Sequence, residues 1–78
     1  MKTTRYFDSI RMRPDRAAIE ERWIAEVVAR PEQEAKQKDG RIRRWGRVAA
    51  AKNRWLRVVL LSDGATVHNA FFDRRFRP

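Results

Sequence analysis

The sequence predicts an α+β fold in which one or two N-terminal helices pack on a four-stranded antiparallel β-meander. An amphipathic segment bounded by Pro14 and Pro31 predicts the main helix. After Pro31 the sequence changes to short runs in which apolar and polar residues alternate, which is typical of strands. Asp-Gly pairs at 39–40 and 63–64 indicate two hairpin turns, because glycine accepts the positive φ that tight turns need.

The length and composition limit what the chain can do. A chain of 78 residues has room for a single domain with one modest core, and we place its helical part at about 5–30 and its sheet at about 33–72. Cysteine is absent, which excludes disulfides and thiolate metal sites. No apolar run has the length of a signal peptide or a membrane span, so we expect an unprocessed cytoplasmic protein with no membrane contact.

The main helix is predicted between the two prolines. Asp15 is placed as its N-cap, and Arg30, directly before Pro31, marks its end. Its apolar residues share one arc of the helix: Ile19, Trp23, Ile24, Val27 and Val28. A shorter helix is predicted ahead of it, with Thr4 as its cap.

The strands are predicted as two hairpins, which pair 33–38 with 41–48 and 54–61 with 66–72. Alternation in the third strand directs Leu56, Val58 and Leu60 towards the helix. The same alternation groups Val67, Asn69 and Phe71 on one face of the fourth strand and His68, Ala70 and Phe72 on the other. Because one main helix covers only one face, the other face is predicted to be open, with these side chains: Arg43, Trp45, Arg47, Trp55, Arg57 and His68.

The positive charge is concentrated in the second half of the chain. The protein has a net charge of +9. Residues 1–40 carry nine Lys or Arg against eight Asp or Glu, a net charge of +1, whereas residues 41–78 carry ten against two, a net charge of +8. Most of the basic residues are arginine, which binds phosphate through paired hydrogen bonds and stacks on bases. This pattern favours a nucleic acid as the partner, because a membrane surface would call for a basic amphipathic helix.

The predicted nucleic-acid-binding residues on the open face are Arg43, Trp45, Arg47, Trp55 and Arg57. Stacking a base on an aromatic ring contributes roughly 1–3 kcal/mol, which adds to the phosphate contacts. Two alternatives stay open. The arginines could form a solvated face that opposes aggregation, and the two tryptophans could be core residues rather than a stacking platform. Phe71, Phe72 and Phe76 are interpreted as packing residues.

His68 is the only histidine, and the basic half lacks a carboxylate cluster, so we predict no metal and no cofactor. A histidine among arginines can remove a proton beside a phosphate that the arginines neutralise. We therefore predict His68 as a candidate general base, and a structural histidine is the alternative. Asp73 could orient His68, or form an ion pair with Arg74 or Arg75, and the ion pair is the simpler interpretation.

The segment "RWLRVVLLSDGATVHNAFFDRR", residues 54–75, resembles the strand-turn-strand of small bacterial families that look like the RelE-type toxin fold. In that fold helices precede a twisted antiparallel sheet, and the resemblance covers about the last two-thirds of the chain. It implies a metal-independent endoribonuclease in which basic residues assist the attack of a ribose 2′-hydroxyl on the next phosphate. Carried over, it implies that Arg57 and Arg74 or Arg75 contact phosphate.

The sequence departs from that family in two ways. RelE-type toxins usually open with a strand that we do not find, and many carry a catalytic tyrosine near the end of the chain, where this sequence has Phe72 and Phe76. The only tyrosine is Tyr6. Our leading hypothesis is a RelE-like RNA-binding protein and endoribonuclease of a toxin–antitoxin pair, with catalytic residues His68, Arg57, Arg74 and Arg75. The alternative is a non-catalytic module that binds nucleic acid or an acidic, antitoxin-like protein.

Overall fold

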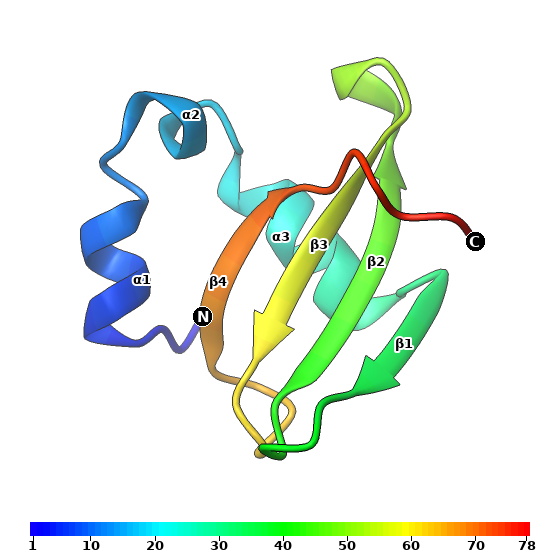
Figure 1. Ribbon diagram of the computed structural model, residues 1–78. Helices are drawn as coiled ribbons and strands as arrows, with labels where there is room; N and C mark the ends of the chain where they lie inside the picture. Colours follow the sequence, from blue (N-terminus) through cyan, green and yellow to red (C-terminus); the bar gives the residue numbers. More distant parts are fainter.

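A computed structural model describes all residues, 1–78, and shows helices packed against one antiparallel sheet (Figure 1). The α+β prediction is confirmed. The elements, in chain order, are α1 (Arg5–Ile10), α2 (Pro14–Ala17), α3 (Glu21–Ala29), β1 (Gln33–Lys36), β2 (Ile42–Val48), the 3₁₀ helix η1 (Ala49–Ala51), β3 (Arg54–Leu60) and β4 (Val67–Phe72).

The sheet is the predicted meander, with the strand order β1-β2-β3-β4 and antiparallel pairing throughout. Each strand starts and ends within two residues of its predicted range. Gly40 and Gly64, in the two predicted hairpin turns, have φ values of 92° and 70°. The two Asp-Gly pairs therefore act as predicted, because only glycine adopts these angles without steric cost.

The prediction of one helix from Asp15 to Arg30 is wrong in its first half. The chain forms the short α2, leaves the helical conformation, and begins α3 at Glu21. Asp15 lies inside α2, and Glu20 rather than Asp15 is the N-cap residue of α3. The break has a tertiary cause: Arg16 anchors α2 to β4 by donating a 2.6 Å hydrogen bond to Asn69 Oδ1, while α3 crosses the sheet. The Thr4 cap of α1 is confirmed, since Thr4 Oγ1 accepts from the Phe7 N–H at 3.1 Å.

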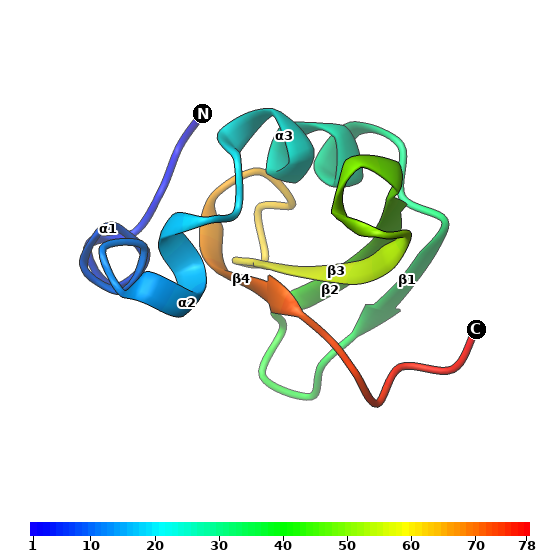
Figure 2. The same ribbon diagram turned by 90° about the horizontal axis from the view of Figure 1, so that it is seen from above.

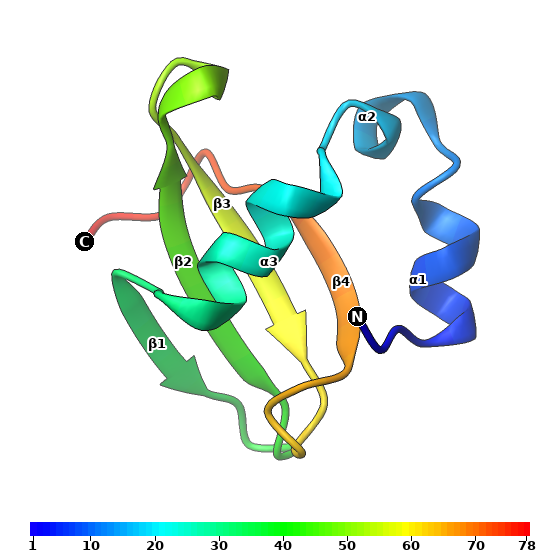
Figure 3. The same ribbon diagram turned by 180° about the vertical axis from the view of Figure 1, so that it is seen from behind.

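Helix α3 crosses one face of the sheet, and the opposite face carries no helix (Figures 2 and 3). Gly46 permits this close packing, because a Cβ atom there would lie 3.0 Å from Val27 Cγ2. Arg44 lies on the helix side of β2, where its charge is paired and its guanidinium is hydrogen-bonded. Its Nη1 donates to the Val28 carbonyl at 2.8 Å and its Nε to Glu34 at 2.7 Å.

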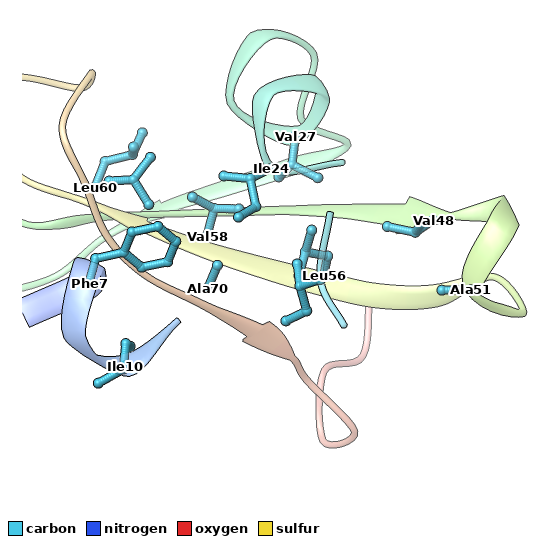
Figure 4. Packing of buried hydrophobic residues seen from close by; sticks show 12 residues of the cluster. Phe7, Ile10, Ile24, Val27, Val48, Ala51, Leu56, Val58, Leu60 and Ala70 are labelled. Carbon is cyan, nitrogen blue, oxygen red and sulfur yellow. The ribbon is translucent and has the colours of Figure 1, made fainter. Parts of the chain in front are cut away.

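The core lies between α3, α1 and the sheet (Figure 4). Leu56, Val58 and Leu60 are fully buried on the helix side of β3, as predicted. The remaining members of the cluster are Phe7, Ile10, Ile19, Ile24, Val27, Val48, Ala51, Val67 and Ala70. The core therefore uses the helix side of the sheet, and no helix covers the opposite face.

The predicted alternation in β4 is wrong because a bulge interrupts it. Val67 pairs with Leu60, but Asn69 pairs with Val59, so His68 is an extra residue without a partner on β3. Val67, Ala70 and Phe72 consequently pack in or against the core, and Asn69 and Phe71 turn to the open side. The N-terminal segment covers the outer edge of β4 beside the bulge, where Thr4 N–H donates to the Val67 carbonyl at 3.0 Å.

Candidate nucleic-acid interface

The C-terminal segment, residues 73–78, crosses the open face in front of β3 and β2 (Figures 1 and 2). It starts where the Asp73 N–H donates to the Trp55 carbonyl at 2.8 Å. The segment separates the predicted site residues into two groups, one at each end of the sheet. One end holds the β1–β2 turn and His68, and the other end holds Trp55, Arg74 and Arg75.

Asp73 pairs with Arg57, and not with Arg74 or Arg75 as we predicted. Asp73 Oδ2 lies 2.9 Å from Arg57 Nη2, and it accepts hydrogen bonds from Arg57 Nε and from Trp45 Nε1, both at 3.0 Å. Burial alone would raise the pKa of Asp73, but the hydrogen bonds from Trp45 and Arg57 outweigh it and lower the pKa. Its side chain is only 8% exposed, and the guanidinium of Arg57 neutralises its charge there.

Of the two predicted stacking residues, Trp45 is buried beneath the C-terminal segment. The Phe76 ring stacks on it with centroids 4.6 Å apart and planes at 16°, and Trp45 is 5% exposed. Trp55 stays half-buried, with the Arg47 guanidinium 5.2 Å above its ring. The core alternative therefore holds for Trp45, and Trp55 keeps surface that a ligand can contact.

Two shallow pockets lie side by side at the other end of the open face and share Gln37. The histidine pocket, about 380 Å³, is lined by Tyr6, Gln37, Arg41, Arg57, Val59, His68, Asn69 and Phe71. The lysine pocket, about 470 Å³, is lined by Ala35, Lys36, Gln37, Lys38, Asp39 and Arg43. Five cationic side chains thus line one continuous surface.

The positive charge of the lysine pocket is not cancelled by its one acid. Asp39 Oδ1 accepts from the Arg41 N–H at 3.0 Å, and Asp39 Oδ2 lies 3.8 Å from Arg41 Nε. Lys36, Lys38 and Arg43 form no ion pair with any carboxylate. With its amide oxygen turned towards Arg43, Gln37 accepts from Nε at 3.1 Å and from Nη2 at 2.8 Å. Gln37 therefore orients Arg43 without neutralising it.

His68 is held by the N-terminal segment. Its Nδ1 lies 3.0 Å from Thr4 Oγ1, and its ring stacks on Tyr6 with centroids 4.9 Å apart and planes at 28°. Its Nε2 has no hydrogen-bond partner. When Nδ1–H donates to Thr4, Nε2 is free to accept a proton from a ligand. Burial lowers the pKa of His68 and Arg41 lowers it further, while Asp39 opposes the shift, so the imidazole is neutral near pH 7.

The lowered pKa of His68 makes folding depend on pH. Because the unfolded state binds the proton more readily, we expect the free energy of unfolding to fall as the pH drops below about 6.5 towards the lowered pKa. Asp63 and Asp73 have lowered pKa values and titrate in a more acidic range. Urea unfolding between pH 7.5 and 5 measures the effect, and His68→Gln should remove it. An unchanged pH dependence in that variant would contradict the assignment.

The predicted catalytic residues are not all brought together. Arg57 lines the histidine pocket with His68, whereas Arg74 and Arg75 follow the far end of β4. Four residues of β4 follow His68 before the strand ends at Phe72, roughly 13 Å of extended chain, and Arg74 lies beyond that end. Tyr6 and Arg41 occupy the histidine pocket instead.

Of the pocket residues that we did not predict, Arg41 had a signal in the sequence. Arg41 directly follows the Asp39-Gly40 turn, so that turn could have placed it beside Arg43. Tyr6 had no local signal, because its position depends on the N-terminal segment that docks against β4, where Thr3 bridges Val67.

Comparisons of the chain with protein families, with curated proteins and with solved structures found no match. None of the helices has the length and the apolar character that a membrane span requires. No group of three or more His, Cys, Asp or Glu side chains is placed to hold a metal ion. The proposal of a function therefore rests on the geometry of the histidine and lysine pockets.

Proposed function

We propose that the protein binds single-stranded RNA across the histidine and lysine pockets. The observation that carries the proposal is the surface joined at Gln37, which presents five cationic side chains and no unpaired carboxylate: Lys36, Lys38, Arg41, Arg43 and Arg57. A line of cations of this kind follows a phosphate backbone. Arg57 still has a donor to offer, because Nη1 takes no part in its hydrogen bonds with Asp73.

Two features favour RNA over an acidic protein partner. Tyr6 is 49% exposed and stacks on His68 with one face, so its other face is available to a base. The lysine pocket has only one apolar lining residue, Ala35, whereas the centre of a protein–protein interface is usually apolar. A partner that places a flat ring beside a phosphate fits these pockets better than a peptide does.

The histidine pocket also favours a second function, the cleavage of bound RNA without a metal ion. His68 Nε2 would take the proton of a ribose 2′-hydroxyl, and the 2′-oxygen would form a bond to the adjacent phosphorus. The bond from phosphorus to the 5′-oxygen then breaks, that oxygen takes a proton from solvent, and a 2′,3′-cyclic phosphate remains. Arg41 and Arg57 would stabilise the charge that develops on the phosphate.

This is the chemistry of RelE-type toxins, and we propose a RelE-like relationship as part of the same hypothesis. Two things support it, namely an order in which helices precede an antiparallel sheet and a tyrosine in the pocket, although Tyr6 comes from the other end of the chain. The alternative proposal is a non-catalytic module that uses the same cations to bind RNA or an acidic protein.

RNA binding should weaken steeply as the salt concentration rises, because each neutralised phosphate releases condensed counterions. For single strands the log–log slope is about −0.7 per contact. Arg43→Gln should therefore reduce the slope by about 0.7, and Arg13→Gln, which removes an exposed, unpaired arginine outside the pockets, should leave it unchanged. Fluorescence anisotropy of labelled single-stranded RNA measures both variants. Affinity that does not respond to salt would refute the proposal.

A further inference from the structure

A third pocket lies at the end of the sheet far from His68, between the C-terminal segment and the ends of β3 and β4. Its volume is about 280 Å³, and we call it the corner pocket. Its lining includes three arginines and three aromatic residues: Arg54, Arg74, Arg77, Trp55, Phe72 and Phe76. None of the sequence motifs predicted a pocket here, because it exists only when the C-terminal segment folds back over the sheet.

The corner pocket concentrates positive charge. Arg54, Arg74 and Arg77 belong to none of the ion pairs in the protein. The one acidic side chain at the pocket, that of Asp73, is nearly buried and is already bound to Arg57. Three arginines therefore line the hollow, and no unpaired carboxylate side chain lies beside them, which is an arrangement that favours a phosphate.

Two of these arginines are already oriented by the fold. Arg54 Nε donates to the Ala51 carbonyl at 3.0 Å, and its guanidinium lies 4.0 Å above the Phe72 ring. Arg77 Nη1 lies 3.4 Å from the Arg74 carbonyl and 3.2 Å from the Phe76 carbonyl. These contacts leave both terminal nitrogens of Arg54 and the Nη2 of Arg77 free to donate to a ligand.

The other walls of the corner pocket are aromatic. Trp55 and Phe76 meet edge to face, with centroids 4.9 Å apart and planes at 64°, and Trp55 is half-buried. A flat ring can stack against such a wall while its phosphate reaches the arginines. The volume lies just below the range of about 300–1,000 Å³ for small-molecule sites, which limits the ligand to about one nucleotide.

We propose that the corner pocket binds a nucleoside monophosphate, with the phosphate among Arg54, Arg74 and Arg77 and the base against Trp55. The ligand is either a free mononucleotide or the 5′-phosphorylated end of an RNA strand, which presents the same chemistry. This site is separate from the histidine and lysine pockets, and it does not depend on RNA binding there.

The test is a titration of the ¹⁵N-labelled protein with AMP, adenosine or inorganic phosphate, followed by NMR at the indole N–H of Trp55. Trp55→Phe assigns that signal. AMP should shift the Trp55 signal with a submillimolar dissociation constant, and adenosine and phosphate should each bind more weakly, because each supplies half of the contacts. The proposal is overturned if AMP does not move the Trp55 signal, or if it moves the signal no more than phosphate does.

Matched variants test the role of the arginines. Arg77→Gln, an exposed position, and Arg54→Gln should each weaken AMP binding about tenfold, the effect of losing one charge-assisted hydrogen bond. Arg5→Gln removes the same charge from α1 and should change the affinity little. Equal losses of AMP affinity in all three variants would show that AMP responds only to the overall positive charge of the protein. That result would overturn the proposal.

A pair of short RNAs identifies the source of the ligand. If an RNA end is the ligand, a 5′-phosphorylated tetra-adenylate should bind more tightly than the 5′-hydroxyl form, and Arg77→Gln should abolish that difference. If a free mononucleotide is the ligand, AMP should bind more tightly than either RNA. A 5′-phosphate without effect on the RNA, together with a failure of AMP to bind, contradicts both sources.

Discussion

Replacing His68 by alanine is expected to lower the rate of RNA cleavage by about 10²–10⁴-fold, which is the usual cost of losing a positioned general base. The reason is the free Nε2 of a neutral imidazole that Thr4 and Tyr6 hold in place beside Arg57. Single-turnover cleavage of a labelled RNA measures the rate. Binding of the same RNA should change little, because the phosphate-contacting cations remain.

Three controls identify this chemistry. Cleavage should proceed in EDTA, it should leave a 2′,3′-cyclic phosphate, and it should stop when the 2′-hydroxyl at the cut site is replaced by hydrogen. RNA that stays whole with and without ribosomes, in EDTA and in magnesium, would remove the catalytic hypothesis. So would a His68→Ala variant that cuts as fast as the parent. RNA binding would then be the whole function of the pockets.

The substitution Arg57→Ala is expected to lower the free energy of unfolding by about 2–4 kcal/mol, close to the cost of breaking a buried ion pair. It would leave the Asp73 carboxylate, 8% exposed, without its cation. It would also remove the guanidinium that lies 4.9 Å from the Phe71 ring and 5.6 Å from the Trp45 ring. Urea denaturation of both proteins at pH 7 measures the difference.

Arg47→Ala is the matched control for this stability effect. Arg47 also lies over a tryptophan and pairs with a carboxylate, but its pair with Glu32 is exposed, with side chains 56% and 41% accessible. Exposed pairs contribute up to about 1 kcal/mol, so this variant should lose much less stability. Adding Asp73→Asn to Arg57→Ala should restore part of the loss. Equal losses in the free energy of unfolding for the two arginine variants would show that Arg57 does not stabilise the buried carboxylate of Asp73.

The sheet could be predicted from the sequence because its signals are local. The alternation of apolar and polar residues identified the side of β3 that faces the helix, and the Asp-Gly pairs identified both hairpin turns. The cap at Thr4 was also a local signal. The same reasoning failed between Pro14 and Glu20, where a continuous helical pattern is interrupted because Arg16 binds β4.

The bulge at His68 had no comparable signal. It arises from pairing between β3 and β4 and from the N-terminal segment that docks beside it, and both are contacts between distant parts of the chain. One extra residue reverses the alternation, which is why Asn69 and Phe71 lie on the face opposite to the one expected. A pattern read along a single strand does not reveal such a shift.

The candidate site was predicted only in part, for a related reason. Alternation identified Arg43 and Arg57 on the open face, where they line the lysine and histidine pockets. It could not show that Phe76 would fold back and cover Trp45. Residues after β4 were assigned to the site from their position in the sequence, and the strand carries Arg74 and Arg75 away from His68.

The most direct test of RNA binding at the two pockets is an NMR titration of the labelled protein with a short single-stranded RNA. We expect the shifts to concentrate on the side-chain amide of Gln37, the ring of His68 and the amide of Arg43. Helix α3, on the far face (Figure 3), should stay unperturbed. Shifts that concentrate on α3, or an RNA that moves no signal at low salt, would contradict RNA binding at the two pockets.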